Sequence, residues 1–351
     1  MTGVRDRTRG IAAAGLCGLV ACGAVAAPRD ALLDVVDDPR AAWRWQVEAG
    51  ADFTQSLFDA VGVNRQAGHL SAARLTGSSG PWSFELGGHR RLVDDGASQH
   101  RVQSWQTALQ FEPGEASADT PGRWALRASA WGNRADELVK DTRASLKVSG
   151  LKARLSEMEL IRPRDRQWQL DGIGRYAPAG SAWAVSGFAG GGRSRVSGAG
   201  VTGQATISGC SYRLQFGESR LTAIPMAGCE RPLMVSIPNS LLQYDVLRET
   251  NYHATWVHTG AALHWRPADW HLVLGVELQR WRHQLPTPVV THNLIAVGEA
   301  TWAVTPSLAL FVRGQYMHRQ LLGEVPMLYN AHSSAASRRH VMTMAGLAAR
   351  F

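Results

Sequence analysis

The last twelve residues, HVMTMAGLAARF, constrain the fold more than any other stretch of the chain. Counting back from Phe351, small or apolar residues occupy every second position as far as Val341, with Leu347 among them, while Arg350 lies on the opposite face. Successive side chains of a β-strand point to opposite faces, whereas a helix repeats every 3.6 residues. The chain is therefore predicted to end in a strand with one apolar face.

The same alternation recurs along most of the chain. In WRWQVEAGADF, Trp45, Val47 and Ala49 share one face, with Arg44 and Glu48 on the other. The alternating segments are 43–53, 69–75, 82–88, 104–111, 124–130, 144–148, 167–176, 182–192, 204–216, 256–265, 270–281, 293–304, 308–318 and 340–351. They predict an all-β fold, a transmembrane antiparallel up-and-down β-barrel of about 14 strands, with 12 or 16 as alternatives. A soluble β-sandwich would show the same period.

The N-terminus is typical of a signal peptide at 1–26. Three arginines precede an apolar run that ends in the small residues Ala24 to Ala26. An alternative is a lipoprotein signal at Leu19 to Cys22, which would leave Cys22 lipidated. No later apolar run approaches the roughly 18 residues that a membrane helix needs. We expect a barrel over 27–351, with a long proline-containing loop at 217–251.

The turns predict which end of the barrel faces the periplasm. The short connections 162–166, 266–269 and 304–307 are expected there, and the longer ones on the outside. Aromatic residues gather beside the short turns: Trp82, Phe111, Trp124, Trp168, Trp265, Trp270, Trp302 and Phe351. A membrane interface favours such a ring, because an indole combines an apolar body with a polar edge. A soluble sandwich gives no reason for it.

The leader, the run of strands and the terminal Phe351 together resemble bacterial outer-membrane β-barrel proteins. The resemblance covers nearly the whole mature chain at the level of architecture and indicates no subfamily. It implies a location in the outer membrane of a Gram-negative bacterium and contact with outer-membrane lipid and lipopolysaccharide. It also implies insertion by the barrel assembly machinery, for which Phe351 would end the assembly signal. The formal net charge of +8 suits lipopolysaccharide phosphates, and nucleic acid is not expected as a partner.

Two of the four cysteines lie in the leader, so the mature chain keeps Cys210 and Cys229. In an oxidising periplasm they are predicted to pair, with a stabilisation of roughly 3 kcal/mol. The bond would tie part of 217–251 to the barrel wall, either narrowing a pore or pinning a surface loop. No Cys or His at ligand spacing accompanies them, so we expect neither a metal nor a cofactor.

The polar faces of the strands carry charges of both signs that would point into the lumen. The predicted pore-lining residues are Arg44, Glu48, Glu85, Arg127, Lys147, Glu277 and Arg313. Such charges either line a wet channel or pair with one another and plug it. The sequence favours a monomeric, non-enzymatic channel or porin-like protein for hydrophilic solutes, with a plugged structural or assembly barrel as an alternative.

Two histidine-containing motifs are candidate chemical sites. His332 and Ser334 form an H-x-S arrangement that resembles outer-membrane acyl hydrolases, so a lipid or lipopolysaccharide hydrolase is a further alternative. His264 and His271 flank the 266–269 turn and would face each other in the lumen. A metal there would need a third ligand, and none is indicated.

Overall fold

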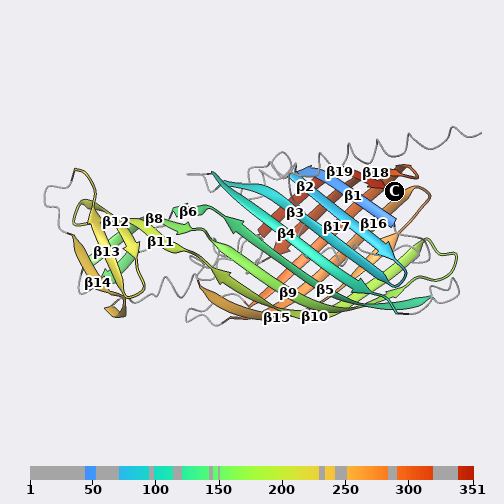
Figure 1. The fold of residues 1–351 in the computed structure, drawn as a ribbon, viewed down its shortest axis with the longest axis horizontal. Helices are drawn as coiled ribbons and strands as arrows, with labels where there is room; N and C mark the ends of the chain where they lie inside the picture. Colours follow the sequence, from blue (N-terminus) through green and yellow to red (C-terminus); the bar gives the residue numbers. More distant parts are fainter. Residues whose placement is uncertain are drawn as a thin grey trace, which may run out of the picture.

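The computed structural model describes residues 44–52, 71–94, 99–113, 121–141, 145–148, 151–228, 234–241, 251–283, 291–318 and 339–351. These residues form a closed barrel of antiparallel strands and a second sheet that projects from it (Figure 1). The barrel strands are β1 (Arg44–Asp52), β2 (Ser71–Ser79), β3 (Trp82–Asp94), β4 (Gln99–Phe111), β5 (Gly122–Ala135), β9 (Arg164–Tyr176), β10 (Trp183–Ser197), β15 (Tyr252–Trp265), β16 (Trp270–His283), β17 (His292–Thr305), β18 (Leu308–His318) and β19 (Arg339–Arg350).

The barrel closes between its first and last strands. β1 pairs antiparallel with β19, with Gln46 opposite Arg350. At the end of this seam, Trp45 and Phe351 exchange two backbone hydrogen bonds of 3.0 Å each. A closed sheet has no free edge, so its backbone groups are bonded even where no water reaches them. We call the barrel end that carries Phe351 the terminal end, and the opposite one the distal end.

The outer face of the barrel is apolar. Large exposed side chains follow the strands around it, among them Leu86, Leu109, Leu126, Leu170, Val257, Leu274, Leu278, Val312 and Leu347. The inward residues at alternate positions are polar or charged in most strands. This inversion of the usual arrangement suits lipid outside the barrel. The protein is a transmembrane β-barrel of the outer-membrane type. No helix in the described part of the chain is long and apolar enough to cross a membrane.

Aromatic side chains border this apolar surface. At the terminal end, Trp82 lies 4.7 Å from Phe111 between ring centroids. Two further pairs are stacked there, Trp183 with Trp265 at 5.3 Å and Trp270 with Trp302 at 5.9 Å. The predicted ring beside the short turns is therefore found at this end, and short links at 80–81, 266–269 and 306–307 lie with it.

Two features assigned to the terminal end lie at the distal end instead. Trp168 is near the start of β9, opposite Ala130, and belongs with Trp105 of β4 to the distal border. The predicted inner turn 162–166 also lies at that end, where the chain enters β9. Both predictions were wrong because the described strands between β5 and β9 belong to the second sheet rather than to a simple outer loop.

The second sheet, called here the outer sheet, has seven strands among the described residues. Its strands are β6 (Glu137–Asp141), β7 (Ser145–Val148), β8 (Leu151–Ile161), β11 (Gly200–Ile207), β12 (Cys210–Phe216), β13 (Arg220–Pro225) and β14 (Val235–Pro238). They come from two insertions, one between β5 and β9 and one between β10 and β15. Figure 1 shows the outer sheet extending beyond the distal end, away from the C-terminus.

In the described part of the chain the barrel has 12 strands rather than about 14, and the outer sheet accounts for the difference. Segments 144–148 and 204–216 alternate like barrel strands, but they form β7, β11 and β12. These strands have 4, 8 and 7 residues, less than the roughly 9–11 that a tilted strand needs to cross a bilayer.

The predicted loop at 217–251 contains structure of its own. It includes the antiparallel pair β13 and β14 and a short 3-10 helix, η3 (Asn239–Leu241). Pro225 and Pro238 are the last residues of β13 and β14. Proline interrupts a strand least at its end or on an edge strand, which explains why two strands form in a segment that looked irregular.

Candidate functional site: a filled lumen

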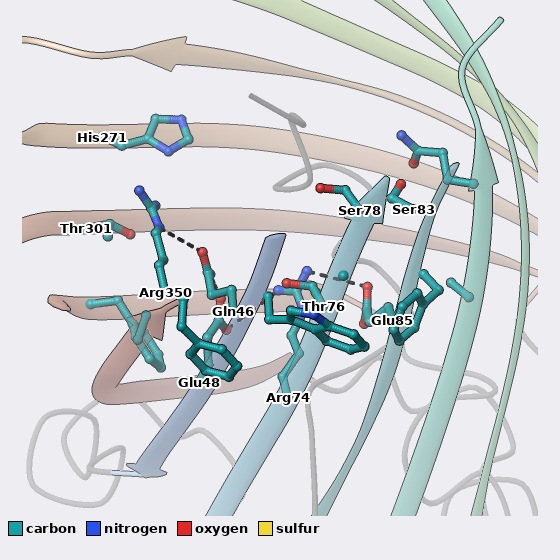
Figure 2. A pocket seen from close by; sticks show the side chains of 18 of the residues that line it. Gln46, Glu48, Arg74, Thr76, Ser78, Ser83, Glu85, His271, Thr301 and Arg350 are labelled. Carbon is teal, nitrogen blue, oxygen red and sulfur yellow. Dashed lines mark hydrogen bonds and ion pairs between the residues drawn. The ribbon is translucent and has the colours of Figure 1, made fainter. Parts of the chain in front are cut away.

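The terminal half of the lumen holds a polar cavity of about 540 Å³ (Figure 2). Six charged residues from six strands form an ion-pair cluster in its wall: Glu48, Arg74, Glu85, Arg127, Glu299 and Arg313. Figure 2 shows Glu48, Arg74 and Glu85 side by side on β1, β2 and β3, with Gln46 and Arg350 nearer the barrel end. The strand alternation places all of these side chains inside the barrel.

Each arginine of the ion-pair cluster contacts carboxylates on an adjacent strand or across one intervening strand. Arg74 lies 3.6 Å from Glu48 and 3.4 Å from Glu85. Arg127 donates to Glu85 at 2.7 Å. The side chains of Arg74, Glu85 and Arg127 are at most 5% exposed. Buried charges need such partners, because an isolated charge loses its hydration without compensation.

The same cluster continues across the seam of the barrel. Arg313 Nε donates to Glu299 Oε2 at 2.5 Å, and its Nη2 lies 3.4 Å from Glu48 Oε2. The side-chain amide of Gln106 donates to Glu85. Through Arg313, the cluster therefore connects β17 and β18 with β1 inside the lumen. This connection adds to the backbone pairing of β1 with β19 that closes the barrel.

A second buried group fills the middle of the lumen. His258 on β15 lies between two carboxylates, with Nε2 2.7 Å from Asp171 Oδ1 and Nδ1 2.9 Å from Glu277 Oε1. Gln169 and Gln279 donate to the same two carboxylates at 2.6 Å each. Both ring nitrogens face an acceptor, so the geometry suits a doubly protonated imidazolium that donates on both sides.

The glycines of β10 make this group possible. His258 reaches Asp171 on β9 by crossing β10, where Gly190 is paired in register with both residues. A Cβ on Gly190 would meet the Asp171 carboxylate and the His258 ring. A Cβ on Gly192, two residues along, would meet the Trp256 ring. Gly190 and Gly192 of the GGG stretch thus leave space in the lumen for side chains of the neighbouring strands.

An aromatic group occupies the distal part of the lumen. The Trp cluster consists of Trp131, Trp256 and Trp281, which are 8%, 3% and 3% exposed. The Trp256 ring lies 5.7 Å from that of Trp131 and 4.3 Å from that of Trp281. These rings belong to one buried apolar cluster that continues into the outer sheet. Among the described residues, the lumen is thus polar toward the terminal end and apolar toward the distal end.

The structure places five of the seven predicted pore-lining residues inside the barrel. Glu48, Glu85, Arg127, Glu277 and Arg313 are all buried, and each has a charged partner. The backbone of Arg44 begins β1, and its side chain lies outside the described part.

The prediction that Lys147 lines the lumen was wrong. It lies on β7, which pairs with β8 in the outer sheet, so it does not belong to the barrel wall. Its strand has the alternation of a barrel strand but only 4 residues. Among the described residues, alternation did not distinguish a strand that crosses the membrane from one that lies beyond it.

Sequence reasoning missed two members of the ion-pair cluster. Arg74 lies in the segment with the weakest alternation, and Glu299 shares its inward face with the apolar Ile295 and Val297. In both segments the alternation of polar and apolar residues is less clear than in the strands of the other cluster members. It therefore did not identify Arg74 and Glu299 as inward-facing. What marks both positions in the sequence is a single charge between two uncharged residues of a strand: Ala73 and Leu75 flank Arg74, and Gly298 and Ala300 flank Glu299.

The histidines beside the 266–269 turn face each other as predicted. His264 Nδ1 lies 3.4 Å from His271 Nε2, and His264 Nε2 lies 2.9 Å from Ser186 Oγ. The residues that the structure describes contain no group of three or more His, Cys, Asp or Glu side chains arranged to hold a metal ion. Segment 1–26, Cys229, His332 and Ser334 lie outside the described residues, so the predictions that involve them are untested.

Comparison with known proteins finds architectural similarity only in solved structures. No protein-family model matches the sequence, and no curated protein matches it. The translocator domain of the autotransporter NalP from Neisseria meningitidis is 11% identical over 98% of each chain, with a TM-score of 0.43. The CymD monoaromatic hydrocarbon channel is 10% identical over 89% of each chain, with a TM-score of 0.38. The Pseudomonas putida toluene transporter TodX is 9% identical over 88% of this chain and 89% of its own, with a TM-score of 0.32.

Proposed function

We propose that this chain is an outer-membrane anchor that presents the outer sheet at the cell surface as an interaction module. The observation that carries this proposal is the buried apolar cluster shared by the barrel and the outer sheet. It contains Val102, Trp131, Val196 and Trp256 from the barrel and Leu160, Val201, Leu214 and Phe216 from the outer sheet. A common core makes the sheet a rigid continuation of the barrel rather than a pair of loose loops.

The filled lumen supports the same proposal. A channel needs a water path, whereas here the inward charges contact one another and the Trp cluster follows them toward the distal end. Paired lumen charges stabilise a closed barrel because each carboxylate has a cation or an amide donor beside it. In this view the membrane domain serves to hold the sheet, and the insertions that form the sheet carry the function.

The side of display follows from the connections. Outer-membrane barrels have short periplasmic turns and longer extracellular connections. The short links lie at the terminal end, and both insertions that form the outer sheet leave from the distal end. We therefore place the outer sheet outside the cell and Phe351 on the periplasmic side.

A second candidate is a channel for hydrophilic solutes, favoured by the polar cavity of about 540 Å³ at the terminal end. Such a channel would have to move the Trp cluster to conduct. Its lumen would then expose a wall of both charge signs, which suits small polar solutes rather than apolar ones.

Single-channel recording separates the two candidates. The mature chain, 27–351, would be refolded, checked by heat-modifiable gel mobility, and added to planar bilayers under a salt gradient. The anchor proposal expects a silent bilayer from folded protein. Discrete current steps would reject it in favour of the channel, and the reversal potential would then report whether cations or anions pass.

Display itself needs a separate measurement. An epitope inserted at the exposed Gly217–Ser219 turn should be detected by antibody on intact cells, and an insertion in the 266–269 turn should be detected only after the outer membrane is permeabilised. Detection of the second epitope alone on intact cells would reverse the proposed orientation.

A further inference from the structure

Arginines collect on the outward face of the barrel at its distal end. They come from four strands, β5, β9, β10 and β16, and every one of them is exposed. We call them the arginine belt: Arg134, Arg164, Arg166, Arg193, Arg195, Arg280 and Arg282. In the barrel, β5, β9 and β10 are adjacent, and β15 separates β10 from β16. At this level β15 carries the exposed His253 and Thr255.

The strand register places these side chains next to one another. Arg166 is paired with Arg195, and Arg195 is paired in turn with His253. Arg134 is paired with Arg164 one row further out. Cross-strand partners share a face of the sheet with Cβ atoms about 5 Å apart. Two or three guanidinium groups can therefore reach one anionic group outside the barrel.

Like charges at this spacing destabilise a sheet unless something compensates for them. Within the described part of the chain, no carboxylate forms an ion pair with Arg166, Arg193, Arg195, Arg280 or Arg282. This differs from the ion-pair cluster in the lumen, where each arginine has a carboxylate. The belt is thus a row of positive charge for which the described chain supplies no counter-charge.

The belt begins where the apolar surface ends. Arg193 is paired with Trp168, which belongs to the distal aromatic border, and Leu170 follows on the apolar side of Trp168. Aromatic side chains of this kind mark the level of the lipid headgroups. The arginines therefore lie at the headgroup level of the leaflet at the distal end, within reach of lipid phosphates and not of a solute inside the lumen.

We propose that the arginine belt is a binding site for the phosphate groups of a phosphorylated glycolipid of the outer leaflet, of the lipid A type. A guanidinium presents two N–H groups in a plane that matches two phosphate oxygens, and such charge-assisted bonds are among the strong ones. A phosphate bridging Arg166 and Arg195 would supply the missing counter-charge. The acyl chains would lie against the apolar surface next to Leu170. Lipid bound here would lie against the outside of the barrel at its distal end, next to the base of the outer sheet.

The test compares two double variants that each remove two positive charges from the full mature chain. Arg166→Gln with Arg195→Gln acts in the belt, whereas Arg154→Gln with Arg213→Gln acts on exposed residues of β8 and β12 in the outer sheet. Each folded protein would be titrated in detergent micelles with bis-phosphorylated lipid A and with the same lipid after removal of its phosphates, and bound lipid would be counted by native mass spectrometry.

We expect wild type and the outer-sheet variant to prefer phosphorylated lipid, and the belt variant to bind it about tenfold more weakly, as the loss of charge-assisted bonds implies. Equal binding of the two lipids by wild type, or equal losses in both variants, would overturn the proposal. Displacement of the lipid by millimolar inorganic phosphate would overturn the assignment to a lipid in favour of free phosphate. If the belt variant does not fold, Arg193→Gln with Arg282→Gln tests the neighbouring row in the same assay.

Discussion

Gly190 lies in register with Asp171 on one side and His258 on the other, and the space its missing side chain leaves is where those two residues meet. A Cβ at this position would stand 2.9 Å from His258 Nε2 and closer still to the backbone carbonyl of Leu170. The contact between histidine and carboxylate therefore crosses an intervening strand only because that strand carries glycine.

Replacement of Gly190 by alanine should destabilise the barrel by about 1–3 kcal/mol, the usual cost of inserting a methyl group into a packed interior. Chemical unfolding in detergent, followed by tryptophan fluorescence, would measure this. Gly187→Ala is the matched control on the same strand, because a Cβ there would meet only the Gly260 carbonyl at an ordinary 3.6 Å. Equal stability of the two variants would contradict the crowding argument.

Removal of the cation between Asp171 and Glu277 should cost more. His258→Leu leaves two buried carboxylates without their shared partner, for which we expect a loss of about 3–5 kcal/mol. Adding Glu277→Gln removes one of those charges, so the double variant should lose less than the sum of the single losses. His253→Leu, exposed on the same strand, should change stability by less than about 0.5 kcal/mol. Additive losses from the two lumen substitutions would show that the three residues do not act as one group.

Much of the barrel follows from local pattern, and the outer sheet does not. Side-chain alternation identified segments in all 12 barrel strands, because lipid outside and polar groups inside impose a period of two. The segment 204–216 shows the same period for another reason, since Tyr212, Leu214 and Phe216 face the core shared with the barrel. Strand length separates this segment from the barrel strands, but β8 of the outer sheet has 11 residues, as many as β18 of the barrel, so neither period nor length alone decides.

Whether the lumen is open or filled depends on how strands far apart in the sequence align with one another. Parity predicted that Glu48 and Arg313 point inward, but their 3.4 Å contact joins residues 265 positions apart. Whether such charges pair or line water depends on how strands align around the closed barrel, which no local window contains. The Trp cluster was hidden for a related reason. At the level of Trp256 the strand is apolar on both faces, because Val257 lies on the outer one. The alternation therefore predicts on which face Trp256 lies, but not that its ring is buried.

Opening the distal lumen should change conductance. Trp256→Ala combined with Trp281→Ala removes two of the three rings in the Trp cluster, and the Trp256 ring is the one that contacts both others. Under the anchor proposal we expect silent wild-type protein and measurable single-channel current from this variant. Truncating a buried tryptophan costs about 3–5 kcal/mol, so folding must be verified by gel mobility before recording. Trp105→Ala, an exposed outward ring, is the control and should stay silent. A silent, folded double variant would mean that other parts of the lumen close it.

The two mature cysteines should be joined in the folded protein. The backbone already brings their surroundings together, because Tyr212 is paired with Pro225 and Met226 N donates to Ser211 O at 2.9 Å. A bond from Cys210 to Cys229 would close this hairpin with a stabilisation of roughly 3 kcal/mol. Maleimide labelling followed by intact-mass measurement should find no free thiol before reduction and two afterwards, and reduction should speed proteolysis of the outer sheet while leaving the barrel resistant. Cys210→Ala with Cys229→Ala should match the reduced protein and no longer respond to reductant. Two labelled thiols in folded, unreduced protein would exclude the bond, and the β12–β13 hairpin would then depend on its hydrogen bonds and on the packing of its buried side chains, Tyr212, Leu214, Phe216, Leu221 and Ala223.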